Sequence, residues 1–573
     1  MGETIEEIFD DIGGFGKAQW ICTVLISYMF LVAAWSMMQM AFAVKIPDWY
    51  CVEETSVNDT QQYGSQQREQ LQQLYTNRSD LFQKCSLNQS SCASYDFVTP
   101  MRTVVNEWSL VCDHKWIPST MISIQMAGVL LGAVLAGQLS ERWGRKRCLT
   151  LAAMWHIVAN VVAACSTSWG MFAACRFLIG VGIGGIYTNT FPYSMEFLPL
   201  KQRASVALFP FWTFGVAIFV GFAYVLPNWR YLHLGCAAFC LPGFAIWFIV
   251  PESIRWLTVE GRLDEAMEAI GKLAQWNGKP VPSDARPTLE MIYYKRKQER
   301  KASGSYSYLD LFRDAYLLKC SVVIAFMWAS MSLISYGISF GAAGLAGNLY
   351  LNILLTNCVE IPGLLPVLWM MNRIGRRWTT VIMFIIITIT TISSLVVNLK
   401  GSSANERVVF WFALVTKLCV DTGWNVIQAW GTELYPTVTR TLGYGVATTS
   451  ARIGGMLAPF LINLKTRLVL TYVTITCLSI TGIFLSFLLP ETRLAALKDN
   501  LSSTASSSLS GNGAELESGI PLAGKPEQNG IQTNSDQNDH DSSSGKESGH
   551  GDSNVTAVLI NGAGHEKSKE YVT

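Results

Sequence analysis

Five ionisable side chains stand inside long apolar stretches of the sequence, where a charge is costly. They are Arg176, Glu360, Lys417, Asp421 and Arg452. A charged group in hydrocarbon costs roughly 3 kcal/mol or more, so each is a candidate for function. Lys417 and Asp421 are four residues apart on one face of a helix. They can equally neutralise each other or take part in binding.

Arg452 and Glu360 carry the charges best suited to binding a solute. Arg452 is predicted at mid-span, before Ile453-Gly454-Gly455, where a guanidinium binds a carboxylate bidentately and repels a bare cation. Glu360 precedes Pro362, which bends a helix and opens backbone groups toward a cavity. One positive and one negative end predict a site for a zwitterion, such as an ammonium carboxylate.

Aromatic and amide side chains on the same predicted helices complete this candidate substrate site. A ring face can stack on an organic solute or hold a quaternary ammonium, although packing is the commoner role of each ring. The amides can add hydrogen bonds. The set comprises Tyr187, Phe191, Trp212, Tyr336, Phe340, Trp424, Asn425 and Gln428.

Other polar residues in apolar stretches are interpreted as structural. Arg176 begins the pattern Arg-x-x-x-Gly180-x-x-x-Gly184, in which small residues let helices approach closely, so we expect a structural arginine near the outer surface. His156 and His233 are lone histidines in apolar helices and are expected to be packing residues. No metal cluster, phosphate-binding loop or nucleophile motif occurs, so the sequence indicates no enzyme and no cofactor.

Composition places these residues in a membrane. Half of the 573 residues are hydrophobic and 15% are charged, against roughly a quarter in soluble proteins. The net charge of +1 gives no indication of a nucleic-acid partner. Twelve apolar stretches have the length of a spanning helix. They are 20–44, 117–139, 148–166, 170–195, 204–226, 231–250, 318–343, 349–371, 378–398, 408–430, 442–464 and 468–489.

Basic residues flank alternate short loops, which the positive-inside rule assigns to the cytoplasm together with both termini. Acidic residues precede the first span, which we therefore expect to be retained. Residues 45–116 then face outside, in agreement with their four cysteines and three glycosylation sequons. The cysteines can pair in three ways. They are Cys51, Cys85, Cys92 and Cys112, and the sequons begin at Asn58, Asn77 and Asn88.

The remaining segments follow from this topology. Residues 1–19 form a cytoplasmic N-terminus. The two six-helix halves are residues 20–250 and 317–489, and a cytoplasmic linker, residues 251–316, joins them. Residues 490–573 form a tail. The linker contains an amphipathic helix at 262–276 and a basic run at 295–301, which can contact anionic lipid or simply be solvated. The tail is too polar to fold. Its serines are consistent with cytoplasmic regulators and equally with any flexible tail.

The two halves repeat each other. Three motifs recur in the same order: Glu141-Arg-Trp-Gly-Arg with Asn372-Arg-Ile-Gly-Arg, Glu196-Phe-Leu-Pro with Glu433-Leu-Tyr-Pro, and Pro251-Glu-Ser with Pro490-Glu-Thr. Two copies of a six-helix unit bind a solute at their interface and rock around it. Positive-inside flanking explains the arginines but not the repeated acids. We predict gating residues that form ion pairs between the halves, namely Glu141, Arg145, Glu196, Arg203, Glu252, Arg376, Glu433 and Arg440.

The motif Gly137-x-x-x-Glu141-Arg-x-Gly-Arg-Lys146 resembles the loop of the major facilitator superfamily. Further motifs are similar to its organic cation, organic anion and zwitterion transporter family: Pro251-Glu-Ser-Ile-Arg-Trp-Leu257, Gly347-Asn-Leu-Tyr-Leu351, Val359-Glu-Ile-Pro362 and Glu433-Leu-Tyr-Pro-Thr437. The resemblance covers about residues 9–491. Asn372 departs from the acid that is usual in the second-half loop, which weakens the expected ion-pair cluster there.

This resemblance implies a fold and a function. The fold is an all-α membrane protein with twelve transmembrane helices in two six-helix pseudo-repeats. In such relatives an acid matching Glu360 lines the central cavity, and Arg452 stands where cation-selective members carry Asp and anion- and carnitine-type members carry Arg. Ala33 stands where a sodium-coupled carnitine relative has Asn, which argues against sodium coupling.

The sequence therefore predicts a plasma-membrane carrier of small organic solutes, most suited to zwitterions such as carnitine, embedded in the lipid bilayer. An organic-anion exchanger is the first alternative, which Arg452 permits and Glu360 disfavours. A non-transporting receptor on the same scaffold is the second.

Overall fold

A computed structural model describes residues 5–52, 85–87, 90–92, 94–98, 101–199, 202, 209–302, 313–341, 347–400, 405–435, 439–462 and 468–493. All of them belong to one unit of the chain, Met1–Gly511. Within them, nine helical segments are long and apolar enough to cross a membrane, and α10 is a shorter apolar helix.

Each of the twelve predicted spans corresponds to a helix or to helical segments in series. The first six are α2 (Lys17–Ala43), α6 (Ile117–Trp143), α7 (Arg145–Ala164), α8 (Trp169–Met195), α10 (Phe211–Val225), and α11 (Trp229–Cys240) with η3 (Leu241–Phe244) and α12 (Ala245–Ile249). The last six are α17 (Ala315–Gly341), α18 (Leu349–Cys358) with α19 (Glu360–Arg373), α20 (Arg376–Leu399), α21 (Asn405–Leu434), α22 (Arg440–Ile462) and α23 (Leu468–Leu488).

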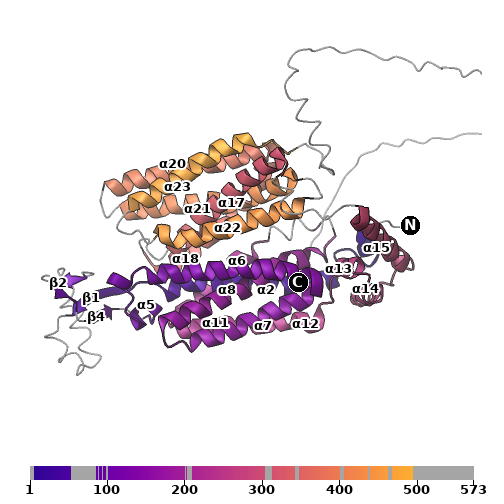
Figure 1. Ribbon diagram of the computed structural model, residues 1–573, viewed down its shortest axis with the longest axis horizontal. Coiled ribbons are helices and arrows are strands. Elements are labelled where there is room, and N and C mark those ends of the chain that lie inside the picture. Colours follow the sequence, from indigo (N-terminus) through magenta and orange to yellow (C-terminus); the bar gives the residue numbers. More distant parts are fainter. Residues whose placement is uncertain are drawn as a thin grey trace, which may run out of the picture. The chain divides into compact units, whose positions relative to one another are not determined.

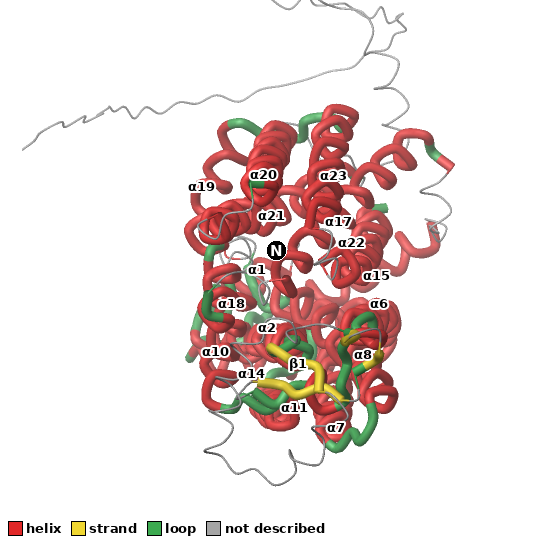
Figure 2. Tube along the Cα trace, turned by 90° about the vertical axis from the view of Figure 1, so that its left-hand side faces the viewer, coloured by secondary structure: helices red, strands yellow, loops and turns green. Residues whose placement is uncertain are grey.

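The helices form two bundles, each with its own hydrophobic core. Phe42, Phe219 and Trp229 are buried in the first bundle, and Phe384 and Trp430 in the second. The bundles correspond to the two halves of the sequence (Figure 1). Viewed along the helices in Figure 2, α22 lies beside α6 and α18 beside α10 at the boundary between them. The predicted all-α membrane fold of two six-helix halves is confirmed.

Glycines let α6 and α8 approach within the first bundle. A Cβ atom on Gly184 would lie 2.3 Å from the carbonyl oxygen of Val129, and one on Gly132 would lie 2.1 Å from that of Val181. Only a residue without a side chain fits such a contact.

A break at Val359 divides the eighth span just before Glu360. Pro362 has no backbone N–H to donate to the carbonyl of Cys358, four residues earlier, so the regular helix is interrupted there. The chain thus places an acid at the start of a helix in the middle of a span.

One end of the first bundle carries β1 (Asp48–Val52), β2 (Ser86–Leu87), β3 (Ser90–Ser91), β4 (Ser94–Val98), α5 (Val104–Glu107) and η2 (Cys112–His114), and we call it the strand end (Figure 1). β1 pairs with β4 antiparallel. Of the three possible pairings, the structure forms Cys51–Cys92 and Cys85–Cys112. The glycosylation sequons at Asn58, Asn77 and Asn88 lie outside the described residues.

Glu107 attaches the strand end to the membrane helices. Its carboxylate accepts hydrogen bonds from Trp229 Nε1 at 2.8 Å and from Arg230 at 2.5 Å, both on α11. Burial on its own would raise the pKa of Glu107, but Arg230 and Trp229 outweigh it and leave that pKa below its ordinary value.

The opposite end, which we call the linker end, carries α1 (Ile5–Asp11), α13 (Ile254–Val259), α14 (Leu263–Asn277) and α15 (Ala285–Ala302). The predicted amphipathic helix is α14, whereas α13 and α15 were not predicted. Asn277 fixes α14 to the start of α2, because its amide donates to Ile12 O at 2.8 Å and accepts from Ala18 N at 2.9 Å.

Candidate functional site

Arg452 lies on α22 at the boundary between the two bundles. Its guanidinium carbon is 5.0 Å from the ring centroid of Tyr187 on α8, and Nη1 donates to Tyr336 Oη on α17 at 3.4 Å. Within the described part of the chain, no carboxylate lies within ion-pair distance of it. Two tyrosines therefore hold the positive charge, and none of the described acids pairs with it.

Glu360 is the first residue of α19. Its Oε2 accepts a hydrogen bond at 3.0 Å from Thr213 Oγ1 on α10, so the contact joins the two bundles. Asn425 on α21 also lies close enough to act on this carboxylate. Asn425 was predicted and Thr213 was not, although its neighbour Trp212 on α10 was.

Lys417 and Asp421 form the ion pair that their spacing allows. Lys417 Nζ is 2.9 Å from Asp421 Oδ1, and both side chains are largely buried. Ser335 on α17 bridges them, accepting from Lys417 at 2.7 Å and donating to Asp421 at 2.8 Å. Ser335 was not predicted. The pair is neutral overall, yet Asp421 repels the charge on Glu360 and Lys417 attracts it.

The predicted aromatic residues fall into two groups. In the first group, Tyr336 stacks on Phe340 with the ring centroids 5.9 Å apart. Tyr187 lies edge-on to Trp212, with the ring centroids 6.4 Å apart. Tyr187 is also 38% exposed, which leaves part of its ring available to a ligand. Phe191 lies one turn farther along α8, and no ring contact in the described residues joins it to the others.

The second aromatic group includes two rings that were not predicted. The ring centroid of Trp328 lies 5.2 Å from that of Trp424 and 5.5 Å from that of Tyr444. The Tyr444 hydroxyl accepts a hydrogen bond from Gln428 Nε2 at 3.1 Å. Trp328 precedes Tyr336 by eight residues, and Tyr444 precedes Arg452 by eight. Residues at that spacing share one face of a helix, so the helical period could have indicated both.

Opposite charges thus flank a tyrosine at the boundary between the bundles. The charges of Arg452 and Glu360 both act on the Tyr187 hydroxyl, which places that ring within reach of the two groups. Two cations, Arg452 and Lys417, face two carboxylates, Glu360 and Asp421. A ligand with one charge of each sign would leave this balance unchanged.

The repeated motifs form two equivalent clusters at the linker end. Gly144 (φ +99°) and Gly375 (φ +105°) turn the chain into α7 and α20. Glu252 accepts from the backbone N–H groups of Arg145 at 3.0 Å and Lys146 at 3.1 Å. In the second half, Glu491 accepts from those of Arg376 at 2.9 Å and Arg377 at 3.0 Å.

Each cluster also contains an arginine paired with an acid of its own half. Arg145 pairs with Glu141 at 2.9 Å and Glu196 at 3.2 Å, and Arg376 pairs with Glu433 at 2.8 Å. Burial raises the pKa of Glu196, and Arg145 opposes that rise. Asn372 stands where Glu141 stands in the first half, so Arg376 has one acidic partner fewer among these positions.

Among the described residues, every ion pair in both clusters lies within one half, so ion pairs between the halves remain a prediction for these residues. The acids lie on helices of the same bundle as their arginines. Each cluster thus braces its own bundle. The side chains of Arg203 and Arg440 lie outside the described part of the structure.

Arg176 belongs to a separate polar network in the first bundle. It is fully buried and donates to Gln39 Oε1 at 3.1 Å, to Ser36 O at 3.2 Å and to Gln125. His156 meets Ser36 Oγ at 2.6 Å. These contacts join α2, α6, α7 and α8, as expected of a structural arginine.

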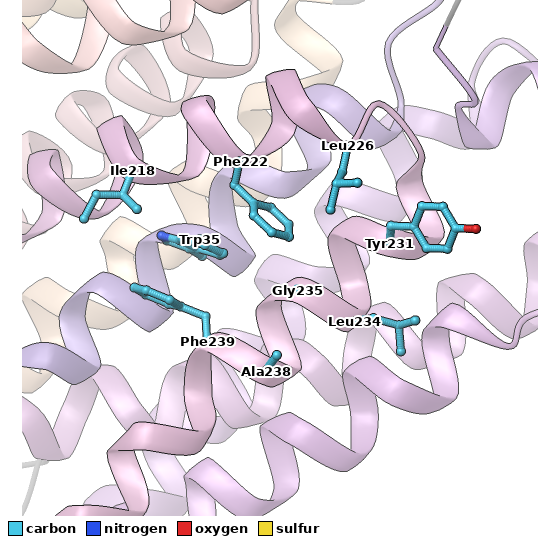
Figure 3. A pocket seen from close by; sticks show the side chains of 9 residues that line it. All are labelled: Trp35, Ile218, Phe222, Leu226, Tyr231, Leu234, Gly235, Ala238 and Phe239. Carbon is cyan, nitrogen blue, oxygen red and sulfur yellow. The ribbon is translucent and has the colours of Figure 1, made fainter.

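A cavity of about 710 Å³ lies away from these charges, between α2, α10 and α11. Trp35 stacks on Phe239 at 3.8 Å along one wall, and Phe222, Leu226, Leu234 and Ile218 complete an apolar lining (Figure 3). Because no charged side chain lines this cavity, it does not match the chemistry of an organic-ion site.

Comparisons with known proteins agree with this architecture. The sequence matches the Sugar (and other) transporter family over residues 62–500. It is 30% identical to an organic cation transporter protein of Drosophila melanogaster over 511 residues, 85% of this chain and 92% of that protein. It is 32% identical to solute carrier family 22 member 7 of Mus musculus over 414 residues, 71% of this chain and 75% of that protein.

A solved structure supports the fold independently. The inward open conformation of the xylose transporter XylE from E. coli matches with a TM-score of 0.57 and 15% sequence identity, covering 84% of this chain and 98% of that chain. The family match over most of the sequence, together with these relatives, shows that this chain belongs to the sugar (and other) transporter family of the major facilitator superfamily, among the solute carrier family 22 proteins, and is a membrane transporter rather than an enzyme.

Proposed function

We propose that this chain is a plasma-membrane carrier of small organic ions, best suited to zwitterionic or amine-bearing solutes of the carnitine type. One observation carries the proposal: Arg452 lies at mid-span between Tyr187 and Tyr336, and the described residues supply no carboxylate to it. A solute carboxylate would provide the missing partner and bind the guanidinium bidentately.

The other end of the site suits an ammonium group. From the other bundle, the Glu360 carboxylate accepts one hydrogen bond, donated by the neutral hydroxyl of Thr213. Asp421 adds negative potential beside it. The exposed face of Tyr187 can hold a methylated ammonium by cation-π attraction. The substrate site then uses Arg452 and Glu360 as its two ends, with Tyr187, Tyr336 and Asn425 between them.

Transport would proceed by alternating access, with the strand end outside and the linker end in the cytoplasm. Ser119 and Ser123 on α6 donate to the carbonyls of Pro459 and Met456 on α22, at 3.3 Å and 2.7 Å, near the strand end. These bonds would break when the outer side opens, while the Arg145 and Arg376 clusters keep each bundle rigid.

The test is uptake of labelled carnitine into expressing cells, competed by unlabelled carnitine, by tetraethylammonium or by a monocarboxylate. We expect strong competition by carnitine and weak competition by either half-analogue. Full competition by the cation with none by the carboxylate would overturn the role of Arg452. Absence of uptake with every solute would favour a receptor.

An organic-anion exchanger is the second candidate. The observation in its favour is that Lys417 is neutralised by Asp421, whereas Arg452 is unpaired in the described residues and can attract an anion. In that case a dicarboxylate loaded inside the cells would accelerate uptake of a labelled anion, and carnitine would not compete.

A further inference from the structure

Three cations gather at the linker end of the first bundle, away from the substrate site. Lys146 and Arg147 lie in the first turn of α7, and Lys272 lies on α14. Lys146 Nζ is 5.4 Å from the ring centroid of Trp247, and Lys272 Nζ donates to the carbonyl of Phe248 at 3.4 Å. Two lysines from segments far apart in the sequence therefore meet over the end of α12.

The positive charge of this cluster is poorly compensated. Lys272 and Arg147 both repel Lys146, and the acid that attracts it is Glu252. One oxygen of Glu252 already accepts the backbone N–H groups of Arg145 and Lys146. Throughout the described residues, no carboxylate lies within ion-pair distance of Lys146, Arg147 or Lys272.

Large apolar side chains surround the cluster on the outside of the bundle. Phe248 is 76% exposed, Trp247 is 43% exposed and Trp143 at the end of α6 is also exposed. Tryptophans on the outside of a spanning bundle are typical of the headgroup level, and lysines near helix ends reach toward that level. The lysines therefore lie beside a surface suited to acyl chains.

The second half provides an internal comparison. Arg377 is the second residue of α20, as Lys146 is of α7, and its guanidinium lies 5.1 Å from the ring of Phe487. The linker helices follow the first half of the chain, and the described residues that follow the second half, which end at Arg493, contain no counterpart of Lys272. Among the described residues, a pair of converging lysines is thus found in the first half.

We propose that Lys146 and Lys272 bind the headgroup phosphate of an anionic phospholipid, whose acyl chains lie along Trp247 and Phe248. The phosphate supplies the negative charge that the cluster lacks, and Arg147 adds to the attraction. The lipid ties α14 to the ends of α7 and α12. This site is independent of the solute that the carrier transports and requires only that the chain spans a bilayer.

The full chain in nanodiscs of phosphatidylcholine, with or without phosphatidylserine, provides the test. Lipids retained after transfer to detergent are counted by native mass spectrometry, and the unfolding midpoint is recorded. We expect selective retention of phosphatidylserine and a higher midpoint in its presence. Each lysine removed should weaken retention roughly fivefold, since a basic residue near an anionic surface contributes about that factor.

Three variants make the result specific. K146Q/K272Q should lose the selectivity, K146R/K272R should keep it, and K279Q, which removes an exposed lysine of the same linker, should resemble the unaltered chain. Equal midpoints in pure phosphatidylcholine show that the variants are folded. Unchanged selectivity in K146Q/K272Q would overturn the proposal, and so would equal protection by soluble inorganic phosphate.

Discussion

At the scale of single residues, Arg452 decides which end of a solute can bind. R452Q removes the charge, whereas R452K keeps it without the planar donors. Losing one member of a desolvated charge pair costs roughly 30-fold or more in binding, so R452Q should reduce carnitine uptake by that factor. Carnitine uptake by R452K should lie between that of R452Q and that of the unaltered chain.

The control for this prediction is uptake of tetraethylammonium by the same variants. A bare cation is repelled by Arg452, so R452Q should transport it as well as or better than the unaltered chain. Surface expression, measured on the same cells, separates loss of binding from loss of protein. If R452Q transported carnitine normally, Arg452 would serve only to hold α8 and α17 beside α22.

At the scale of elements, the contact of α6 with α8 depends on glycine. G184A would place a methyl group 2.3 Å from the carbonyl oxygen of Val129, which the two helices can relieve only by moving apart. Overpacking of this kind costs roughly 1–3 kcal/mol. The unfolding midpoint in detergent should fall. G137A on α6 is the matched control, because nothing lies within 4 Å of its Cβ, and it should leave the midpoint unchanged or raise it.

Glu107 makes the attachment of the strand end sensitive to pH. In the folded chain, the pKa of Glu107 lies below its ordinary value. The charged carboxylate therefore stabilises the fold at any pH above the ordinary pKa. This stabilisation is lost as the pH falls through the lowered pKa of the folded chain. E107Q should lower the unfolding midpoint by roughly 2–5 °C at about pH 7. At a pH below the ordinary carboxyl value, the difference between the two midpoints should shrink. An equal difference at both pH values would mean that the charge of Glu107 is not responsible.

At the scale of the whole molecule, transport requires α6 and α22 to separate near the strand end. A cysteine pair at Ser123 and Met456, joined by a short bifunctional thiol reagent, should reduce uptake at least about tenfold, and reductant should restore it if the reagent carries a disulfide. The exposed native Cys165 and Cys477 are first changed to serine. The controls are the two variants that carry only one of these cysteines, treated with the same reagent. Undiminished uptake by the cross-linked pair would contradict alternating access at this contact.

The sequence predicted the twelve spans from long apolar stretches, and it predicted the charged side chains because a charge stands out in such a stretch. Thr213 and Ser335 were missed because their proximity to the site depends on how separate helices are rotated against one another. Trp328 and Tyr444 could have been found from the helical period, since each lies eight residues before a predicted site residue. How the helices are rotated also decides which partners the gating acids reach. The repeat identifies equivalent positions, but it does not say whether an arginine reaches its own half or the other.

The two serines that join α6 to α22 bond to main-chain carbonyls, not to side chains. A carbonyl oxygen is present whichever residue carries it. Other apolar residues should therefore be able to replace Met456 while the outer side still closes. Ser123 cannot be replaced in this way, because its hydroxyl donates the hydrogen bond. In a library of variants scored for transport, position 456 should tolerate many residues and position 123 few.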